Sequence, residues 1–73
     1  MNLAVVARLR FIDCMLEQYG TINRVVLTDY FGLSVPQVSL DIKAYMEAAP
    51  ANMVYDKTLR AYKRTPEFKR VFP

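Results

Sequence analysis

Two carboxylates one helical turn apart, Asp13 and Glu17, and the single thiol of Cys14 are the side chains whose types come closest to catalytic chemistry. The sequence has no His and only one Cys, so it cannot build a Ser-His-Asp or Cys-His nucleophile, a Cys/His zinc site or an intrachain disulfide. Asp13 and Glu17, beside Arg10, are better explained as the polar face of a helix, and Cys14 as a small apolar side chain. We therefore expect no enzyme activity, no metal and no cofactor.

Another set of polar side chains, spaced two to four residues apart, has the chemistry of nucleic-acid binding. The amide of Gln37 can form paired hydrogen bonds with N6 and N7 of adenine. Ser34 and Ser39 can donate to phosphates or bases, and Lys43 can reach a phosphate. Each has a simpler alternative, because Ser34 and Gln37 have the S-x-x-Q spacing of a helix capping box and Lys43 could be merely solvated.

The positive charge is concentrated in the last quarter of the chain. The net charge is +3, yet residues 56–73 alone give +4, residues 1–34 cancel and residues 35–55 give −1. Four of these cations fall on a predicted β-hairpin: Lys57, Arg60, Lys63 and Arg64. The asymmetry favours a polyanion partner, although a solvated surface explains charge alone equally well.

Apolar periodicity and capping residues predict the elements that position these side chains. The expected helices, each after an Asn or Ser cap, are Leu3 to about Tyr19, Arg24 to Phe31, and from Ser34 to about Ala48. Thr21-Ile22 is long enough only for a short piece of strand, and the hairpin pairs Met53–Tyr55 with a run from about Arg60 to Arg64. Two helices joined by a tight Gly-containing turn and followed by a hairpin predict a mainly α fold with a small β-hairpin, a winged helix-turn-helix.

Apolar faces predict the core and a further contact surface. The inner stripes are Val5, Leu9, Ile12, Leu16 and Tyr19 on the first helix, and Val38, Ile42, Tyr45 and Ala49 on the third, with Pro36, Leu40 and Lys43 opposite. The first helix carries a second apolar strip, which we interpret as contact surface for a tail, another domain or a second copy, because a chain this small has too few elements to cover it. We expect a homodimer whose interface uses that strip and the tail: Ala4, Ala7, Phe11, Met15, Phe68, Val71 and Phe72.

The run from Gly20 to Arg24, and the run from Tyr30 to Asp41 with its Ser-x-Pro-Gln-x-Ser-x-Asp motif, also resemble a known family. They are similar to the N-terminal winged helix of WYL-domain transcriptional regulators, specifically the repressors beside bacterial phage-defence gene clusters, and more loosely to DeoR-type domains. The resemblance covers roughly residues 8–72. It implies a dimeric, sequence-specific repressor whose recognition helix uses Pro36, Gln37, Ser39 and Lys43, with Arg60 and Lys63 on the wing. The ligand-sensing WYL domain of those regulators is not among the matching residues.

We therefore expect residues 1–73 to form one DNA-binding domain, with residues 65–73 as a dimerisation or linker segment. The expected partner is double-stranded DNA carrying an inverted repeat, and the expected location is the cytoplasm, because no apolar run approaches the about 20 residues of a membrane span. The predicted DNA-binding residues are Ser34, Pro36, Gln37, Ser39, Leu40, Lys43, Lys57, Arg60, Lys63 and Arg64. The alternative is a winged helix that binds protein rather than DNA. Whether the chain stands alone or is one domain of a longer protein stays open.

Overall fold

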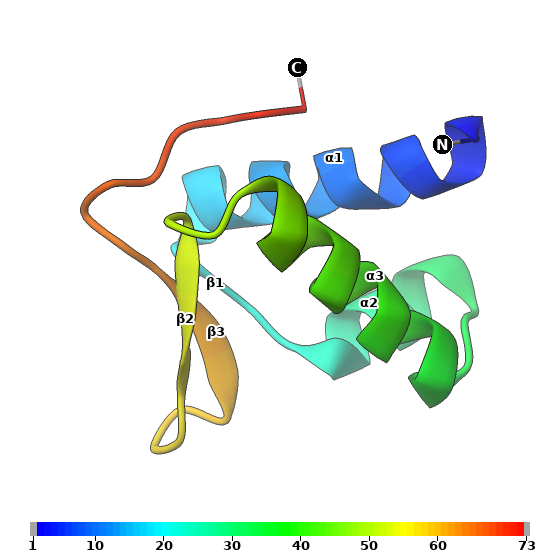
Figure 1. Cartoon of the computed structure of the whole chain (residues 1–73). Helices are drawn as coiled ribbons and strands as arrows, with labels where there is room; N and C mark the ends of the chain where they lie inside the picture. Colours follow the sequence, from blue (N-terminus) through cyan, green and yellow to red (C-terminus); the bar gives the residue numbers. More distant parts are fainter. Residues whose placement is uncertain (1, 73) are drawn as a thin grey trace.

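The computed structural model describes residues 2–72, in which three helices enclose a core beside a small three-stranded sheet (Figure 1). The elements in chain order are α1 (Leu3–Tyr19), β1 (Thr21–Ile22), α2 (Arg24–Phe31), α3 (Val35–Ala48), β2 (Met53–Asp56) and β3 (Ala61–Arg64). This order confirms the predicted winged helix-turn-helix. None of the helices that residues 2–72 form combines the length and hydrophobicity needed to cross a bilayer.

Local side-chain chemistry sets the helix ends. The side chains of Asn2, Asn23 and Ser34 each accept a hydrogen bond from the backbone N–H three residues later, at 2.9, 2.9 and 3.3 Å. Gly20 and Gly32 follow α1 and α2 with φ of 79° and 65°, a left-handed conformation that favours glycine. The predicted helix boundaries are confirmed. They could be predicted because each helix begins next to the residue whose side chain caps it.

The sheet joins the wing to the rest of the fold. Its strand order is β1-β3-β2, all antiparallel, with Tyr62 opposite Ile22 on one side and opposite Tyr55 on the other. The predicted hairpin is thus confirmed, and the short strand β1 adds a third strand to it. Because β1 directly follows α1 and precedes α2, the wing is attached at the point where those two helices meet.

The core lies between α1, α3 and the sheet. Its buried apolar side chains are Leu9, Ile12, Leu16, Ile22, Leu27, Val38, Ile42, Tyr45, Ala49, Met53 and Tyr62. The inner stripe predicted for α3 is fully buried. The stripe predicted for α1 is buried at its centre but wrong at Tyr19, which is 73% exposed in the last turn, where Gly20 reverses the chain.

The second apolar strip of α1 is covered by the chain itself more than we expected. Phe11 stacks on Tyr30 with ring centroids 4.6 Å apart and meets Phe31 edge-on at 5.2 Å. Met15 also packs against the core, as do Phe68 and Phe72 from the end of the chain. The expectation that the chain has too few elements to cover these side chains is therefore wrong in part, because the four largest of them are half-buried within the chain itself. Ala4, Ala7 and Val71 remain exposed, and the dimer interface stays a prediction.

The C-terminal segment, residues 65–72, returns along α1 to the side away from the wing tip (Figure 1). Asp13, expected on the polar face of α1, is instead completely buried there. Its carboxylate accepts hydrogen bonds from the Tyr45 hydroxyl and from the backbone N–H groups of Val71 and Phe72, the latter two at 2.7 and 2.6 Å. The prediction that Asp13 lies on an exposed polar face was wrong, because the spacing of residues within α1 does not show that partners from α3 and the C-terminal segment bury it.

Candidate nucleic-acid interface

The outward face of α3 presents the side chains expected of a recognition helix. Pro36, Leu40 and Lys43 are exposed, and Gln37 and Ser39 are half-buried beside them. Pro36 occupies the first turn, where its missing N–H removes no helical hydrogen bond. The N-terminal half of α3 therefore offers amide, hydroxyl, ammonium and apolar groups on one face.

The Gln37 side chain is oriented by Asp41, not by the helix cap. Ser34 accepts the backbone N–H of Gln37, but the Gln37 amide donates through Nε2 to Asp41 Oδ1 at 3.0 Å. The reciprocal half of the predicted capping box is therefore wrong, since the i,i+4 partner on the same helix competes with the cap for this amide. The bond to Asp41 uses one N–H of the Gln37 amide and leaves its Oε1 and its second N–H available. A bidentate contact with adenine needs one such acceptor and one such donor.

Asp41 is itself held by α1. The Arg8 guanidinium donates to both carboxylate oxygens, Nε to Oδ2 at 2.5 Å and Nη2 to Oδ1 at 3.2 Å. The side chains of Arg8 and Asp41 are only 13% and 3% exposed. This buried pair joins α1 to α3 and neutralises an acidic group on the helix that carries the candidate base-reading side chain.

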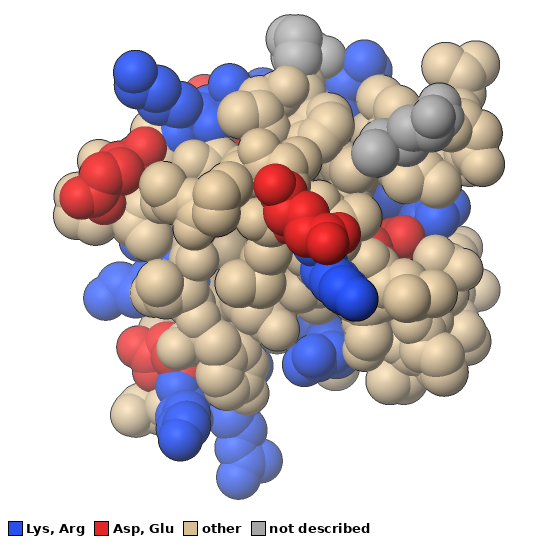
Figure 2. All heavy atoms as spheres, in the orientation of Figure 1, with Lys and Arg blue, Asp and Glu red and all other residues tan. Residues whose placement is uncertain are grey.

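The wing exposes all four of its predicted cations, Lys57, Arg60, Lys63 and Arg64. Figure 2 shows Lys and Arg side chains projecting at the lower tip of the molecule, where the β2–β3 turn lies. Asp56 Oδ1 accepts the Leu59 N–H at 2.9 Å and so shapes this turn. Arg60 has a φ of 54°, which is unusual for a residue other than glycine.

Arg64, also predicted to bind DNA, has its guanidinium engaged elsewhere. Its Nη1 donates to the carbonyl oxygens of Leu16 and Glu17 at 3.1 and 2.9 Å. These carbonyls belong to the last turn of α1, which attracts cations and needs donors. The side chain thus ties the wing to α1.

Arg24 was not among the predicted site residues, although it lies where α2, α3 and β3 meet. Its Nε is 3.3 Å from Ser39 Oγ, its Nη2 is 3.5 Å from the Tyr62 hydroxyl, and its guanidinium carbon is 5.9 Å from the centre of the Tyr62 ring. The sequence did hold one signal. Arg24 is the first residue of a helix, where the helix dipole disfavours a positive charge.

The C-terminal end of α3 differs from this open face. Burial, followed by the hydrogen bond to Asp13, raises the pKa of the Tyr45 hydroxyl above its usual range, so the phenol stays protonated and donates. Asn52 Nδ2 donates to the Tyr45 oxygen at 3.0 Å and to the Lys69 carbonyl at 2.7 Å, and Asn52 Oδ1 accepts the Lys69 N–H at 3.1 Å. These bonds fix the corner between α3 and β2, and hence the base of the wing.

Three helices, a tight turn before a capped third helix, and a hairpin with exposed cations define the winged helix-turn-helix class. The family described as "BrxR transcriptional regulator winged helix-turn-helix domain" matches residues 4–73. The chain belongs to that family, which confirms the resemblance to winged-helix transcriptional regulators.

Curated relatives carry the name "DNA-binding transcriptional repressor CapW". The protein from Pseudomonas aeruginosa is 54% identical over 66 residues, covering 90% of this chain and 22% of the relative. The protein from Escherichia coli strain KTE188 is 51% identical over 65 residues (89% and 22%), and that from Stenotrophomonas maltophilia is 47% identical over 64 residues (88% and 21%). The chain thus spans about a fifth of the length of these relatives.

Proposed function

We propose that this domain is the DNA-reading part of a transcriptional repressor and binds double-stranded DNA in a sequence-specific way. It acts without catalysis, in the cytoplasm, and requires no metal or cofactor. The names of its relatives support repression and DNA binding, and its family supports a role in transcription.

The observation that carries the proposal is that the two groups of side chains proposed to contact DNA lie on the same side of the molecule. In Figure 1 the N-terminal half of α3 and the wing tip both descend away from α1 and the C-terminal segment. The exposed side chains of α3 suit a major groove, and the exposed cations Lys57, Arg60 and Lys63 suit the adjacent backbone or minor groove.

Within this arrangement Gln37 reads a base, oriented by Asp41. Pro36 and Leu40 offer apolar contact of the kind that recognises a thymine methyl group, and Lys43 reaches a phosphate. The Ser34 oxygen caps α3, which leaves its hydroxyl proton free for a phosphate. Arg64 is exposed, but its guanidinium is hydrogen-bonded to the last turn of α1, so we do not count it among the direct contacts.

We further propose that two copies bind an inverted repeat, because one recognition helix reads too few base pairs for useful specificity. A two-fold dimer would place two such helices about 34 Å apart, or a multiple of that. Ala4, Ala7 and Val71 are the predicted interface residues that stay exposed. Ala7→Asp should therefore leave the fold intact and abolish pairing. A wild-type mass near 8.4 kDa by light scattering of the free protein at tens of micromolar, with intact binding to a single half-site, would overturn the dimer.

Selection of bound sequences from random duplex DNA, followed by a mobility-shift titration, tests the central proposal. We expect an enriched inverted repeat bound far more tightly than random DNA, with affinity falling steeply as salt rises. No retention on heparin and no selected sequence would contradict it and favour a protein-binding domain. The exposed Leu3 and Tyr30, at 88% and 69%, would then be the first places to search for a partner contact.

A further inference from the structure

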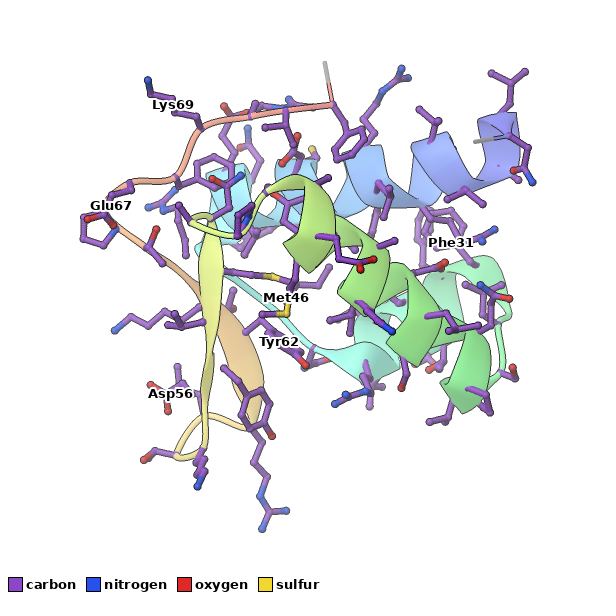
Figure 3. All side chains as sticks on the ribbon, viewed as in Figure 1. Phe31, Met46, Asp56, Tyr62, Glu67 and Lys69 are labelled. Atoms are coloured by element: carbon purple, nitrogen blue, oxygen red, sulfur yellow. The ribbon has the colours of Figure 1, made fainter. Side chains whose placement is uncertain are left out.

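The Arg24 guanidinium lies at a junction of three elements that the proposed DNA contacts leave unassigned. It extends from the start of α2 to the Ser39 hydroxyl on α3, at 3.3 Å, and to the Tyr62 hydroxyl on β3, at 3.5 Å. Figure 3 shows Tyr62 between the hairpin and the helices. The junction therefore places one guanidinium and two hydroxyl groups between the recognition helix and the wing.

The contacts that Arg24 makes do not satisfy its charge. Both partners are neutral oxygens at the long end of the hydrogen-bond range. Within residues 2–72, ion pairs join only Arg8 to Asp41 and Arg70 to Glu17, so Arg24 has no carboxylate partner there. A guanidinium has five N–H donors in a planar fork that fits two oxygens of a phosphate.

The position of Arg24 does not serve the stability of α2 either. A cation in the first turn of a helix opposes the helix dipole, and the first turn of α2 contains no acidic residue to offset it. Instead, the guanidinium is kept above the Tyr62 ring, 5.9 Å from its centre, which orients it without neutralising it.

We propose that Arg24, together with the hydroxyl groups of Ser39 and Tyr62, forms a binding site for one phosphodiester group of the DNA backbone. This inference rests on the proposed function and adds a contact from α2. The bound phosphate bridges α2, α3 and β3, so it also fixes the wing relative to the recognition helix. Arg24 thereby sets where the two reading elements sit along one strand.

The test compares Arg24→Gln with Lys69→Gln, a matched loss of one positive charge. The Lys69 side chain projects away from Tyr62, beside the C-terminal segment (Figure 3). Both variants and the wild type are titrated with the selected operator over a range of salt concentrations. We expect Arg24→Gln to bind roughly tenfold more weakly, with the slope of log K against log salt smaller by about 0.9, and Lys69→Gln to match the wild type.

Phosphate ethylation interference on the same operator locates the contact. We expect the wild type to show one blocked phosphate between those attributed to α3 and to the wing, and Arg24→Gln to lose sensitivity at that phosphate alone. Tyr62→Phe keeps the ring and removes only the hydroxyl, so it should weaken the same signal without moving the others. If Arg24→Gln does not fold by circular dichroism, Arg24→Lys replaces it, and we then expect the salt slope to be kept and the ethylation signal at that phosphate to weaken.

The possible failures are distinct. A wild type that binds no duplex overturns the proposed function and this site with it. A wild type that binds DNA, beside an Arg24→Gln variant with an unchanged slope and ethylation pattern, overturns only the Arg24 site. A saturable shift of the Arg24 Nε NMR signal with inorganic phosphate at constant ionic strength, combined with an unchanged DNA slope, would make it a free-anion site and also overturn the proposal.

Discussion

Lys57, Arg60 and Lys63 on the hairpin are exposed at a turn, whereas the C-terminal segment that follows, although its cations are also exposed, is hydrogen-bonded to the rest of the fold. There Arg70 lies 3.3 Å from Glu17 and also donates to the carbonyl of Phe72. The backbone of that segment is fixed by Asn52 and Asp13. Both regions are rich in Lys and Arg, yet only the hairpin carries its cations on the side of the recognition helix. Net charge along a sequence therefore locates basic residues but does not distinguish those that can meet a ligand from those next to a structural anchor.

The largest effect should come from removing the anchor. Asp13→Ala leaves the Tyr45 hydroxyl and two backbone N–H groups without their buried acceptor, and we expect a loss of about 3 kcal/mol or more in the free energy of unfolding. Because a domain of this size has only a few kcal/mol to lose, much of the variant should be unfolded. Urea titration followed by circular dichroism measures this.

Glu17→Ala is the control for that variant. It breaks only a partly exposed ion pair with Arg70, so its loss should stay within about 1 kcal/mol. Similar losses in the free energy of unfolding for the two variants would show that the C-terminal segment is not an anchor. The proposed difference between that segment and the hairpin would then be wrong.

The hairpin should show the opposite behaviour. In the double variant Lys57→Gln with Lys63→Gln, we expect the salt slope of DNA binding to fall by about 0.9 for each phosphate that the wing no longer neutralises, equally for operator and random DNA. The free energy of unfolding should change by less than about 0.5 kcal/mol, because both side chains are exposed. An unchanged slope would mean that the wing does not touch the backbone.

Gln37→Ala tests base reading separately from charge. We expect a loss of about 1–3 kcal/mol on the selected operator and little on random DNA. Stability should fall by about 1 kcal/mol at most, since Ser34 caps the backbone N–H of Gln37 and only the amide bond to Asp41 disappears. Equal binding losses on both DNAs would assign the side chain to structure alone.

The smallest effect concerns the wing turn. Arg60→Gly removes a charge and relieves a φ of 54°, so the protein should become more stable by about 1 kcal/mol while binding DNA more weakly. Arg60→Ala is the matched control, because it removes the same charge but keeps a Cβ and therefore does not relieve the strain of the positive φ. Identical melting temperatures for the two would mean that Arg60 carries no backbone strain.

Local rules predicted nearly all of the fold. Each helix begins at an Asn or Ser that caps it, and the first two end at a left-handed glycine, so the signals lie within a few residues of the features they determine. The helical periodicity of the apolar residues in α3 likewise predicted which of its side chains lie on the outer face. The i,i+4 spacing of Gln37 and Asp41 was also present in the sequence and could have shown that the two side chains meet.

The missed features depend on contacts far along the chain. The partners of Asp13 lie 32, 58 and 59 residues away, and no local pattern distinguishes a buried carboxylate that receives such bonds from an exposed one. Arg24 meets Ser39 and Tyr62, at separations of 15 and 38 residues. Coverage of Phe11 required knowing that α2 folds back across α1.

The bonds from Asp13 to the backbone of Val71 and Phe72 also bear on how the domain is made. A ribosome adds about 5–20 residues per second, so α1 is synthesised several seconds before those two residues. Until residues 71 and 72 leave the exit tunnel, the Asp13 carboxylate lacks two of its three hydrogen-bond donors. The native core can therefore close completely only after this C-terminal segment has been translated. Until then, the Asp13 carboxylate on nascent helix α1 stays without these two backbone partners.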